Sequence, residues 1–594
     1  MPFQASDPSG PDPFAEAERL LGAGRIEEAK FKLHRLTQHP EHGAAACLRL
    51  GQIYRRERQA LESIEWFQQA AKAQPDWAEA HHELALALLD CQRAQEAVAS
   101  LQQALALDKA HAGARRTLAN LLQAAGHWRE AAQEYAELLP VQPNDPTLFQ
   151  QFGLCCQELG EFQLAEKAYL KTLHFGLDSP ELQFNLGATR LKLGRPLEAI
   201  STFQKALLQD PLLTLANLGM ANAYRQLGDL DSAEACLRRE LEINPNCADA
   251  AVNLGVLLHE RHRVGEAIGC YKKAISLNPH HPILRWNFAI ASLLAGDFKT
   301  GWNEYEWRWQ VKHKPKPKFP QPEWDGSDLN GRALLLYAEQ GFGDTLMFAR
   351  YAPLVARRGG RVVMQCQPPL KRLLAAMPDL QVVAEGEPLP PCDVQAPLMS
   401  LPRIFGAALD AEHRWEPYLR VPPETDWKLP AHDATKIKVG LAWASNPHHP
   451  VSSQKSVALA RWEPVLSVPH CEFFSLQIDP DPSATAVMQS RPNLHGLPAR
   501  FGDFADTAAA ISQLDLVISV DTAVAHLAGG LGHLVWVLLS FSADWRWLLK
   551  RRDSPWYPTM SLFRQPQPGN WDAAISEVAT HLTELSARMA HERR

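Results

Sequence analysis

Small residues recur every 34 positions through the first half of this 594-residue chain, and no other feature restricts the fold as strongly. One series holds alanine or glycine at every step: Ala17, Gly51, Ala85, Ala119, Gly153, Gly187, Ala221, Gly255 and Ala289. A second series lies twelve residues further on: Ala29, Ser63, Ala97, Ala131, Ala165, Ala199, Ala233, Ala267 and Gly301. Because two helices approach closely only where side chains are small, the two series predict a row of helix pairs.

Prolines follow the second series by another twelve residues, at Pro75, Pro143, Pro211, Pro245 and Pro279. A proline lacks the amide donor and clashes with the preceding turn, so it ends the second helix of a pair. This period and pattern resemble the tetratricopeptide repeat. The resemblance implies an α-solenoid over residues 14–310, and such solenoids bind peptides or whole proteins on a concave surface.

Three asparagines stand two positions before members of the first series, at Asn185, Asn253 and Asn287. This position faces the groove of the repeat, and a side-chain amide both donates and accepts hydrogen bonds. A column of amides therefore pairs with an extended peptide backbone, as in the O-GlcNAc transferase superhelix that this half resembles. The alternative is that asparagine is simply common there in repeats of every function.

The array ends in residues 296–310, which are rich in tryptophan (Trp302, Trp307 and Trp309). Aromatic bulk suits a cap over the open apolar face of the last repeat, and a platform for a sugar is the alternative. Residues 311–331 alternate lysine with proline, which predicts an extended, semi-rigid linker and not a nucleic-acid patch.

Apolar runs that alternate with helical patterns begin at Arg332 and predict an α/β fold. The predicted strands are residues 333–337, 361–366, 381–384, 436–443, 473–477, 515–520 and 534–540, with a helix over 345–358 between the first two. Continuous apolar strands imply parallel sheets covered on both faces. The proline-rich residues 416–433 separate two doubly wound lobes, 332–425 and 434–585. Ligands bind at the carboxyl ends of the strands in such folds, which predicts a cleft between the lobes.

The loop after the first predicted strand carries Gly341, Gly343 and Asp344. It lacks the third glycine of a dinucleotide fingerprint and the Gly-Lys-Ser/Thr of a Walker loop. Asp344 stands where a helix begins, so it either caps that helix or acts as a general base. The helix dipole keeps such a carboxylate ionised, which suits late deprotonation of a hydroxyl that attacks a dissociative glycosyl centre.

Two further loops supply residues that suit an anionic ligand. Asp521 and Thr522 lie where a buried strand meets a helix whose free amides bind phosphate oxygens, and His526 follows one turn later. The alternative is a capped helix with an internal histidine. Lys455 is the one cation after the 436–443 strand that suits a diphosphate leaving group, unless it is merely solvated.

Two motifs that suggest a metal are set aside. His448 and His449 have no acidic or cysteine partner at ligand spacing. Asp479 and Asp481 match a D-x-D motif, but their proline-containing stretch favours a turn over a rigid ligand set.

The stretches "GDTLMFARYAPLV", "KVGLAW" and "ISVDTAVAHLAGGLG" together resemble the heptosyltransferase family, glycosyltransferase family nine, of GT-B architecture. The resemblance implies that Asp344 is the catalytic base. It implies that Gly343, Lys455, Asp521, Thr522 and His526 hold a nucleotide sugar. It also implies inversion of configuration with no cofactor and no metal. Ala523 departs from the family's glycine, and the first lobe is short, which disfavours a lipid-linked acceptor.

The layout of a repeat array before a transferase is similar to O-GlcNAc transferase and to bacterial flagellin glycosyltransferases. It implies a transferase that modifies serine and threonine hydroxyls of a captured, flagellin-like protein, since tethering raises the effective concentration of the acceptor. Transfer to a glycan or lipid-linked saccharide and a non-catalytic protein-binding scaffold remain the alternatives.

The bulk composition fits this interpretation. A net charge of −7 disfavours a nucleic-acid partner. The sequence has no signal peptide and no apolar run long enough to span a membrane. The ten scattered cysteines lack zinc or redox spacing, which predicts reduced thiols in a cytoplasmic protein.

Overall fold

The computed structural model describes residues 13–311, 316–406, 416–446, 452–497 and 500–592. The chain divides into two compact units, residues 1–245 and residues 246–594. Compactness alone does not test the domain boundaries expected from the sequence, so these remain predictions.

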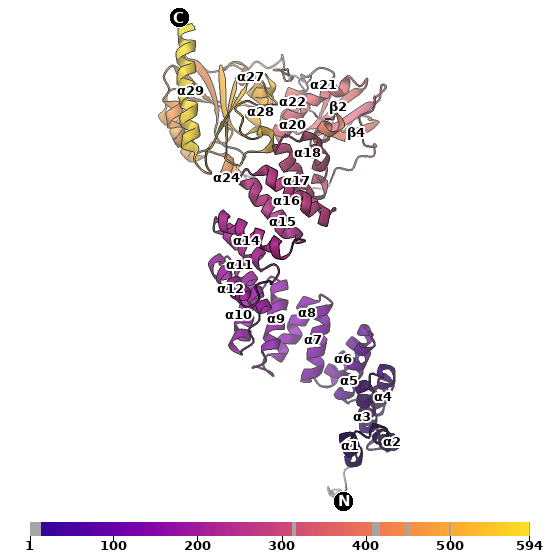
Figure 1. The fold of residues 1–594 in the computed structure, drawn as a ribbon. Helices are drawn as coiled ribbons and strands as arrows, with labels where there is room; N and C mark the ends of the chain where they lie inside the picture. Colours follow the sequence, from indigo (N-terminus) through magenta and orange to yellow (C-terminus); the bar gives the residue numbers. More distant parts are fainter. Residues whose placement is uncertain (1–12, 312–315, 407–415, 447–451, 498–499, 593–594) are drawn as a thin grey trace, which may run out of the picture. The chain divides into compact units, whose positions relative to one another are not determined.

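The first unit consists of antiparallel helix pairs that follow one another in sequence order (Figure 1). Its helices are α1 (Ala15–Gly22), α2 (Ile26–Leu36), α3 (Gly43–Arg56), α4 (Ala60–Ala73), α5 (Ala78–Asp90), α6 (Ala94–Leu107), α7 (Ala112–Ala124), α8 (Trp128–Leu138), α9 (Pro146–Glu158), α10 (Phe162–His174), α11 (Pro180–Lys192), α12 (Pro196–Gln209), α13 (Ala216–Gln226) and α14 (Leu230–Ile243). The predicted helix pairs are therefore confirmed.

The small-residue series is explained by close contact inside each pair. A β-carbon added to Gly51 would lie 2.6 Å from the ring of Phe67, and one added to Gly187 would lie 2.8 Å from the ring of Phe203. Gly153 faces Tyr169 in the same way, at 2.7 Å. Since real β-carbons do not approach so closely, the glycine makes room for an aromatic ring on the second helix.

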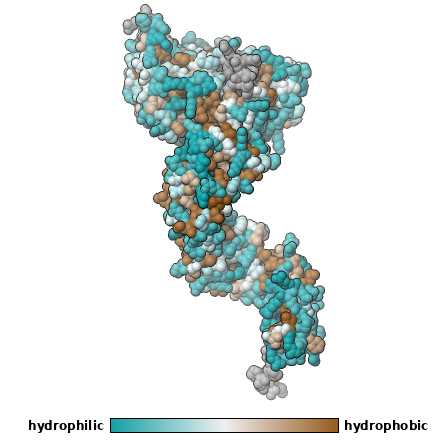
Figure 2. All heavy atoms as spheres, in the orientation of Figure 1, coloured by the Kyte–Doolittle hydropathy of each residue, from teal (hydrophilic) through white to brown (hydrophobic). Residues whose placement is uncertain are grey.

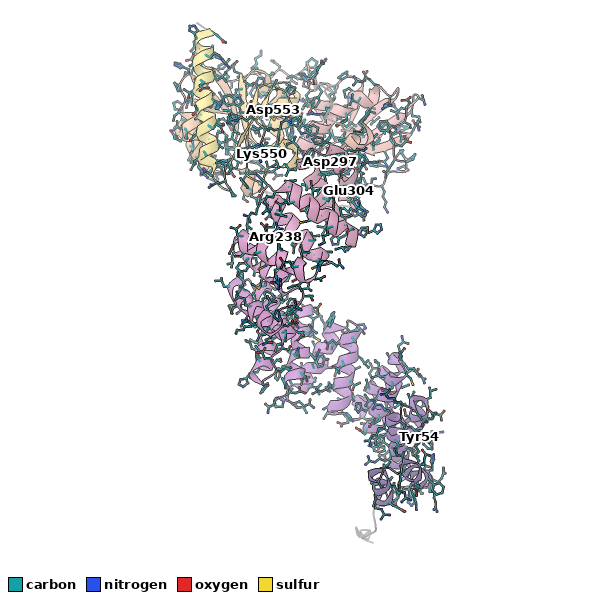
Figure 3. All side chains as sticks on the ribbon, viewed as in Figure 1. Tyr54, Arg238, Asp297, Glu304, Lys550 and Asp553 are labelled. Atoms are coloured by element: carbon teal, nitrogen blue, oxygen red, sulfur yellow. The ribbon has the colours of Figure 1, made fainter. Side chains whose placement is uncertain are left out.

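The second unit begins with two more helix pairs and a short helix: α15 (Ala248–Glu260), α16 (Val264–Leu277), α17 (Pro282–Leu294), α18 (Phe298–Tyr305) and α19 (Arg308–Val311). Glu304 of α18, labelled in Figure 3, accepts a hydrogen bond of 2.7 Å from Arg285 of α17. Trp302 is buried and its ring packs edge-on against Phe348 and Trp545, with centroids 5.6 and 5.0 Å apart. The end of the array is thus capped by tryptophan, as predicted.

A four-stranded parallel sheet follows, with the strand order β3-β2-β1-β4. Its strands are β1 (Ala333–Tyr337), β2 (Arg361–Cys366), β3 (Leu380–Ala384) and β4 (Val394–Pro397). The prediction of a single unbroken helix between β1 and β2 is wrong. The segment instead forms α20 (Phe342–Phe348), a 3-10 turn at Ala349–Tyr351 and α21 (Ala352–Ala356). Pro353, which has no amide hydrogen, lies in the first turn of α21 and accounts for this break.

The last part of the unit holds a six-stranded parallel sheet with the order β10-β9-β8-β5-β6-β7. Its strands are β5 (Ile437–Ala442), β6 (Cys471–Ser475), β7 (Leu494–Gly496), β8 (Leu516–Val520), β9 (Val535–Leu539) and β10 (Met560–Arg564). The longest helix of the described chain, α29 (Trp571–Glu592), buries Trp571, Ile575 and Val578 in the core of this sheet.

Shorter helices connect the strands of both sheets. They are α22 (Lys371–Leu374), α23 (Leu401–Ile404), α24 (Ser452–Lys455), α25 (Glu463–Leu466), α26 (Pro482–Ser490), α27 (Phe504–Ser512) and α28 (Ala523–Gly530). All seven predicted strands are confirmed, while β4, β7 and β10 were not predicted. Two of these three are very short, and β10 lies outside the motifs that drew attention to the other strands.

The visible face of the molecule mixes hydrophilic and hydrophobic residues, with apolar patches over the repeat helices (Figure 2). Among the residues that contribute exposed apolar surface are Leu197 and Leu208 on α12. Within the described residues, every helix is too short or too polar to cross a bilayer.

Candidate functional site

The predicted site residues lie near the point in each sheet where the strand order reverses. In the six-stranded sheet the chain runs outward from β5 through β6 to β7, and then from β8 through β9 to β10 on the other side. The switch therefore lies between β5 and β8, and a crevice opens beyond the carboxyl ends of strands at such a point. The loops after β5 and β8 begin at this switch, and the loop after β9 begins at the neighbouring strand. The four-stranded sheet has its own switch between β1 and β4, beside the loop that leads to Asp344.

Lys455 and Asp521 form an ion pair across the switch of the six-stranded sheet. Lys455 Nζ donates to Asp521 Oδ2 at 2.5 Å, and only 20% and 10% of the two side chains are exposed. Burial opposes the charge of the lysine, but Asp521 and Asp544 raise the pKa of Lys455 above its ordinary value. The ammonium is therefore a fixed positive charge at neutral pH.

Arg546, in the loop after β9, joins this cluster to the other sheet. Its guanidinium donates to Asp344 Oδ1 and, at 2.7 Å, to Asp544 Oδ1. Burial works against its charge, yet the carboxylates of Asp544 and Asp344 raise the pKa of Arg546. For Asp544, burial alone would raise the pKa, and Arg546 with Lys455 hold it below its usual range. Asp344 thus lies within the same charged network as Lys455 and Asp521.

Asp344 occupies the third position of α20 and not the cap itself. The cap residue is Gly341, whose amide donates to Asp344 Oδ2 at 3.0 Å. Both carboxylate oxygens are therefore engaged, one by the helix end and one by Arg546. About 20% of the side chain is exposed, so the group is still reachable from solvent.

The loop that carries Asp344 is held by the last helices of the array. The fully buried Arg308 of α19 grips both oxygens of Glu339, at 2.7 and 2.9 Å. Gln340 donates to the hydroxyl of Tyr305 on α18 at 3.1 Å. A bidentate arginine–carboxylate pair fixes orientation as well as distance, so the repeats set the position of this loop.

The start of α28 lies against α20. A β-carbon on Gly343 would lie 2.9 Å from Cδ2 of His526, so the glycine is required by the close approach of the two helices. Thr522 is the cap residue of α28, but its side chain accepts no capping hydrogen bond and instead meets Ser519 Oγ at 3.0 Å. Thr522 thus gives the first amides of α28 no side-chain cap, and the free amides at such a helix start suit an anionic ligand.

His526 is a buried, neutral histidine. Its Nδ1 lies 2.9 Å from the hydroxyl of Tyr557, and its ring stacks on Trp547 with centroids 5.4 Å apart. Burial lowers the pKa of His526 to about 4. At neutral pH this side chain offers one hydrogen bond and no charge.

A cavity of about 260 Å³ lies beside Arg546. Its walls come from α15, α17, Tyr305 and Gln340, together with residues 542–546 of the loop after β9. It therefore adjoins the helix repeats on one side and the partner of Asp344 on the other. Apolar rings and charged groups both line it, which suits a ligand of mixed character.

The structure brings Gly343, Asp344, Lys455, Asp521, Thr522 and His526 into one region, linked by the contacts above. Asn253 and Asn287 are half-buried on α15 and α17 of the second unit, and Asn185 is half-buried on α11 of the first unit. His448 and His449 lie outside the described residues. Asp481 accepts from the amide of Ala484 at 2.9 Å and caps α26, and Asp479 has a positive φ of 50°, which fits the predicted turn.

Sequence reasoning missed Asp544, Arg546, Tyr305 and Glu339. The rule that singled out the loops after the other strands also applies to residues 540–547, which follow the predicted strand 534–540. The loop holds an Asp-Trp-Arg-Trp run, which matches no known ligand motif. Tyr305 and Glu339 carry no signal in the sequence, since their importance arises from contact between the array and the sheets.

Fold and site together define a repeat protein joined to an α/β part with two parallel sheets. Models of the tetratricopeptide repeat match residues 44–76, 88–152, 180–211 and 218–299. The chain therefore contains tetratricopeptide repeats, which generally bind protein partners.

Relatives of the chain include proteins of different kinds. Protein FlbA of Caulobacter vibrioides is 25% identical over 512 residues, which are 78% of this chain and 82% of that protein. Human protein O-mannosyl-transferase TMTC3 is 26% identical over 260 residues, 41% of this chain, and the match spans only 28% of TMTC3. Among solved structures, YrrB, a TPR protein with an unusual peptide-binding site, superimposes with a TM-score of 0.27 and 24% identity, over 31% of this chain and 95% of YrrB.

Proposed function

We propose that the chain is an inverting glycosyltransferase that moves a sugar from a nucleotide donor to serine or threonine hydroxyls of a protein held by the repeats. Residues 332–425 and 434–585 are proposed as the two lobes of a GT-B fold, and residues 14–310 as the capture array. The observation that carries the proposal is the link between Asp344 at one chain reversal and the Lys455–Asp521 pair at the other. Relatives such as TMTC3, whose name describes a protein O-mannosyltransferase, support the reaction class.

In the proposed reaction, Asp344 accepts the proton of the acceptor hydroxyl. The hydroxyl oxygen attacks the anomeric carbon from the face opposite the diphosphate, and the bond from that carbon to the phosphate oxygen breaks. The electron pair leaves with the nucleoside diphosphate. Lys455, the hydroxyl of Thr522, the imidazole of His526 and the amides of α28 stabilise the negative charge that develops there. These groups require neither a metal nor another cofactor.

The contact of Arg546 with Asp344 suggests a role for Arg546 in this reaction. It occupies Oδ1 of Asp344, the oxygen that the helix cap leaves available. A donor diphosphate competes for the guanidinium, because phosphate and carboxylate accept from it in the same bidentate way. Movement of Arg546 onto the donor frees Asp344 for the acceptor, and the 260 Å³ cavity beside it receives the acceptor segment.

The test compares the wild-type chain with Asp344→Asn, which keeps the size of the side chain. Intact masses of the filament and secreted proteins are measured in cells that contain wild type, the variant or no copy of the chain. We expect sugar increments with wild type alone. The exposed Asp426→Asn, with 86% of its side chain in solvent, serves as the control and should behave as wild type. Increments that persist with Asp344→Asn would contradict the role of the carboxylate.

A non-catalytic scaffold is the second candidate, and one observation favours it. Both oxygens of Asp344 are already bonded, as expected of a purely structural carboxylate. Calorimetry with uridine, guanosine and cytidine nucleotides separates the two candidates. A transferase gives heat with at least one nucleotide and loses it in Lys455→Met, whereas a scaffold gives none. Unchanged protein masses with sugar increments on a glycan would instead favour transfer to a saccharide.

A further inference from the structure

We propose that Glu79, His82 and His111 form a binding site for a divalent transition-metal ion, of which zinc is the best fit, at the junction of two repeats in the first unit. Glu79 and His82 lie on α5 and His111 precedes α7. One ligand atom from each of the three lies within 4.8 Å of the other two. Two imidazoles and one carboxylate are a donor set that suits zinc, with water in the fourth position.

His82 already presents a lone pair to this point. Thr117 Oγ1 donates to the carbonyl of Gly113 at 2.9 Å, so it accepts from Nε2–H of His82, 3.4 Å away. The proton of the ring is therefore on Nε2, and Nδ1 is left as an acceptor. Among the described residues, this buried Nδ1 has no hydrogen-bond partner, and it lies 4.0 Å from Glu79 Oε2. A metal-ligating histidine typically donates its other N–H to an outer partner, as His82 does to Thr117.

The other two ligands need a small adjustment. His111 Nε2 lies 2.9 Å from Glu79 Oε2, and its Nδ1 accepts from the amide of Ala114 at 3.1 Å. Zinc on Nε2 moves the ring proton to Nδ1, so the hydrogen bond from the amide of Ala114 is broken when the ion binds. Ligand atoms around a tetrahedral zinc ion stand roughly 3.4 Å apart, given bonds of about 2.0–2.1 Å. The separations from Glu79 Oε2, 2.9 Å to His111 Nε2 and 4.0 Å to His82 Nδ1, lie on both sides of this value, so the ligand atoms are already near the spacing that zinc needs.

The chain around Glu79, His82 and His111 leaves room for this arrangement, and the next junction does not. A β-carbon at Gly113 would lie 2.9 Å from Cε1 of His82, so glycine lets the ring pack against the backbone of the first turn of α7. At the next junction, 34 residues later, the positions of His82 and His111 hold Arg116 and Asp145, which form an ion pair. An ion pair thus fills this position in the later junction, whereas in the junction of His82 and His111 the Nδ1 lone pair of His82 has no partner among the described residues.

About 43% of the Glu79 side chain is exposed, against 13% and 14% for His82 and His111. An ion therefore enters from the side of Glu79 and is held by two nearly buried rings. Because its ligands come from α5 and from the start of α7, a bound ion joins two consecutive repeats and stiffens the array there.

The test titrates the full-length chain, stripped of metal by dialysis against a chelator, with zinc chloride in a calorimeter. The decisive variant is His82→Arg with His111→Asp, which copies the Arg116–Asp145 pair and so keeps the junction folded. His111→Asn is a second variant, which retains a cap for α7. His81→Ala, a neighbour on α5 that contacts the carbonyl of Pro75, is the matched control.

We expect wild type and His81→Ala to bind one more equivalent of zinc than the double variant, and to gain thermal stability on binding. His111→Asn should bind that equivalent at least about tenfold more weakly. Cobalt in place of zinc should give a tetrahedral visible spectrum in wild type and His81→Ala, and none in the double variant. Equal zinc stoichiometry and affinity in wild type and the double variant would overturn the proposal, and the pair would then be a hydrogen-bonded contact alone.

Discussion

Arg546 donates to Asp344 and Asp544 at once, so a single guanidinium ties a carboxylate beside the four-stranded sheet to one beside the six-stranded sheet. Nine-tenths of the Arg546 side chain is excluded from solvent. Arg546→Met therefore leaves two carboxylates without their partner, and we expect a loss of about 3–5 kcal/mol in the free energy of unfolding. Urea denaturation followed by tryptophan fluorescence measures it.

The matched control for that change is Arg551→Met. Arg551 pairs with Asp553, labelled in Figure 3, of which 70% is exposed. An exposed pair contributes little, so the loss should stay below about 1 kcal/mol. Equal losses in the two variants would mean that Arg546 is not an essential link between the carboxylates.

The buried pair of Lys455 and Asp521 should show strong coupling. Lys455→Met or Asp521→Asn alone leaves a charged group without its hydrogen bond, and we expect each to cost about 1–3 kcal/mol of unfolding free energy. The double variant should lose less than the sum of the two, because it removes both charges together. A double-mutant cycle from urea denaturation gives this difference, and strict additivity would show that the pair contributes nothing.

His526 should make stability depend on pH in a defined interval. Its folded-state pKa is about 4 and its ordinary value is 6.5, so the unfolded chain binds a proton that the folded chain excludes between these values. Stability therefore rises with pH from about 4 to 6.5 and is lost as the pH falls, by at most about 3 kcal/mol. The contribution is the difference between wild type and His526→Gln in denaturation series across this interval. Parallel curves for the two proteins would contradict the assignment.

Gly343 should tolerate no side chain. Gly343→Ala places a β-carbon 2.9 Å from His526, which forces α20 and α28 apart and should cost about 1–3 kcal/mol. Gly341→Ala is the control, because its β-carbon would meet only Asp344 Oδ2, at an ordinary 3.5 Å. Thermal unfolding distinguishes them: a large drop in Tm for the first and a small one for the second. The reverse order would contradict the helix contact.

The asparagines should matter for the acceptor and not for the donor. Replacing Asn185, Asn253 and Asn287 by alanine removes three amide groups that suit an extended peptide. We expect roughly a tenfold or greater loss in the rate at which the acceptor protein gains mass, with nucleotide binding unchanged. Gln204→Ala on the exposed side of α12 is the control. Unchanged acceptor modification in the triple variant would remove the asparagines from the proposal.

The local sequence pattern was sufficient to predict those helices and strands whose structure depends mainly on their own residues. The 34-residue series predicted the helix pairs, and β1 and β2 have the predicted bounds, because a run such as ALLLY is buried on both faces. The sequence also singled out Lys455, Asp521 and Asp344, because each follows such a strand, and the structure links them by contacts. Their roles in binding and catalysis stay predictions. The sequence did not predict that Arg546 donates a hydrogen bond to Asp344, or that Arg308 pairs with Glu339.

Those contacts join residues that are 202 and 31 positions apart, and they depend on how helices and sheets pack. The Glu79, His82 and His111 group was missed for a related reason. Its residues match no metal-ligand spacing along the chain, and they meet only because one repeat stacks on the next.

The tryptophan at the end of the array restricts how such a protein can diversify. Trp302 packs on Phe348 and Trp545, and Arg308 orients the loop before Asp344. The final helices of the array therefore also form part of the packing of the α/β part. Repeats upstream of residue 245 can therefore be swapped, added or deleted to change recognition specificity, whereas changes near residue 300 disturb the α/β part. Chimeras designed with the junction before α15 should retain the α/β machinery, while those cut after α18 should lose it.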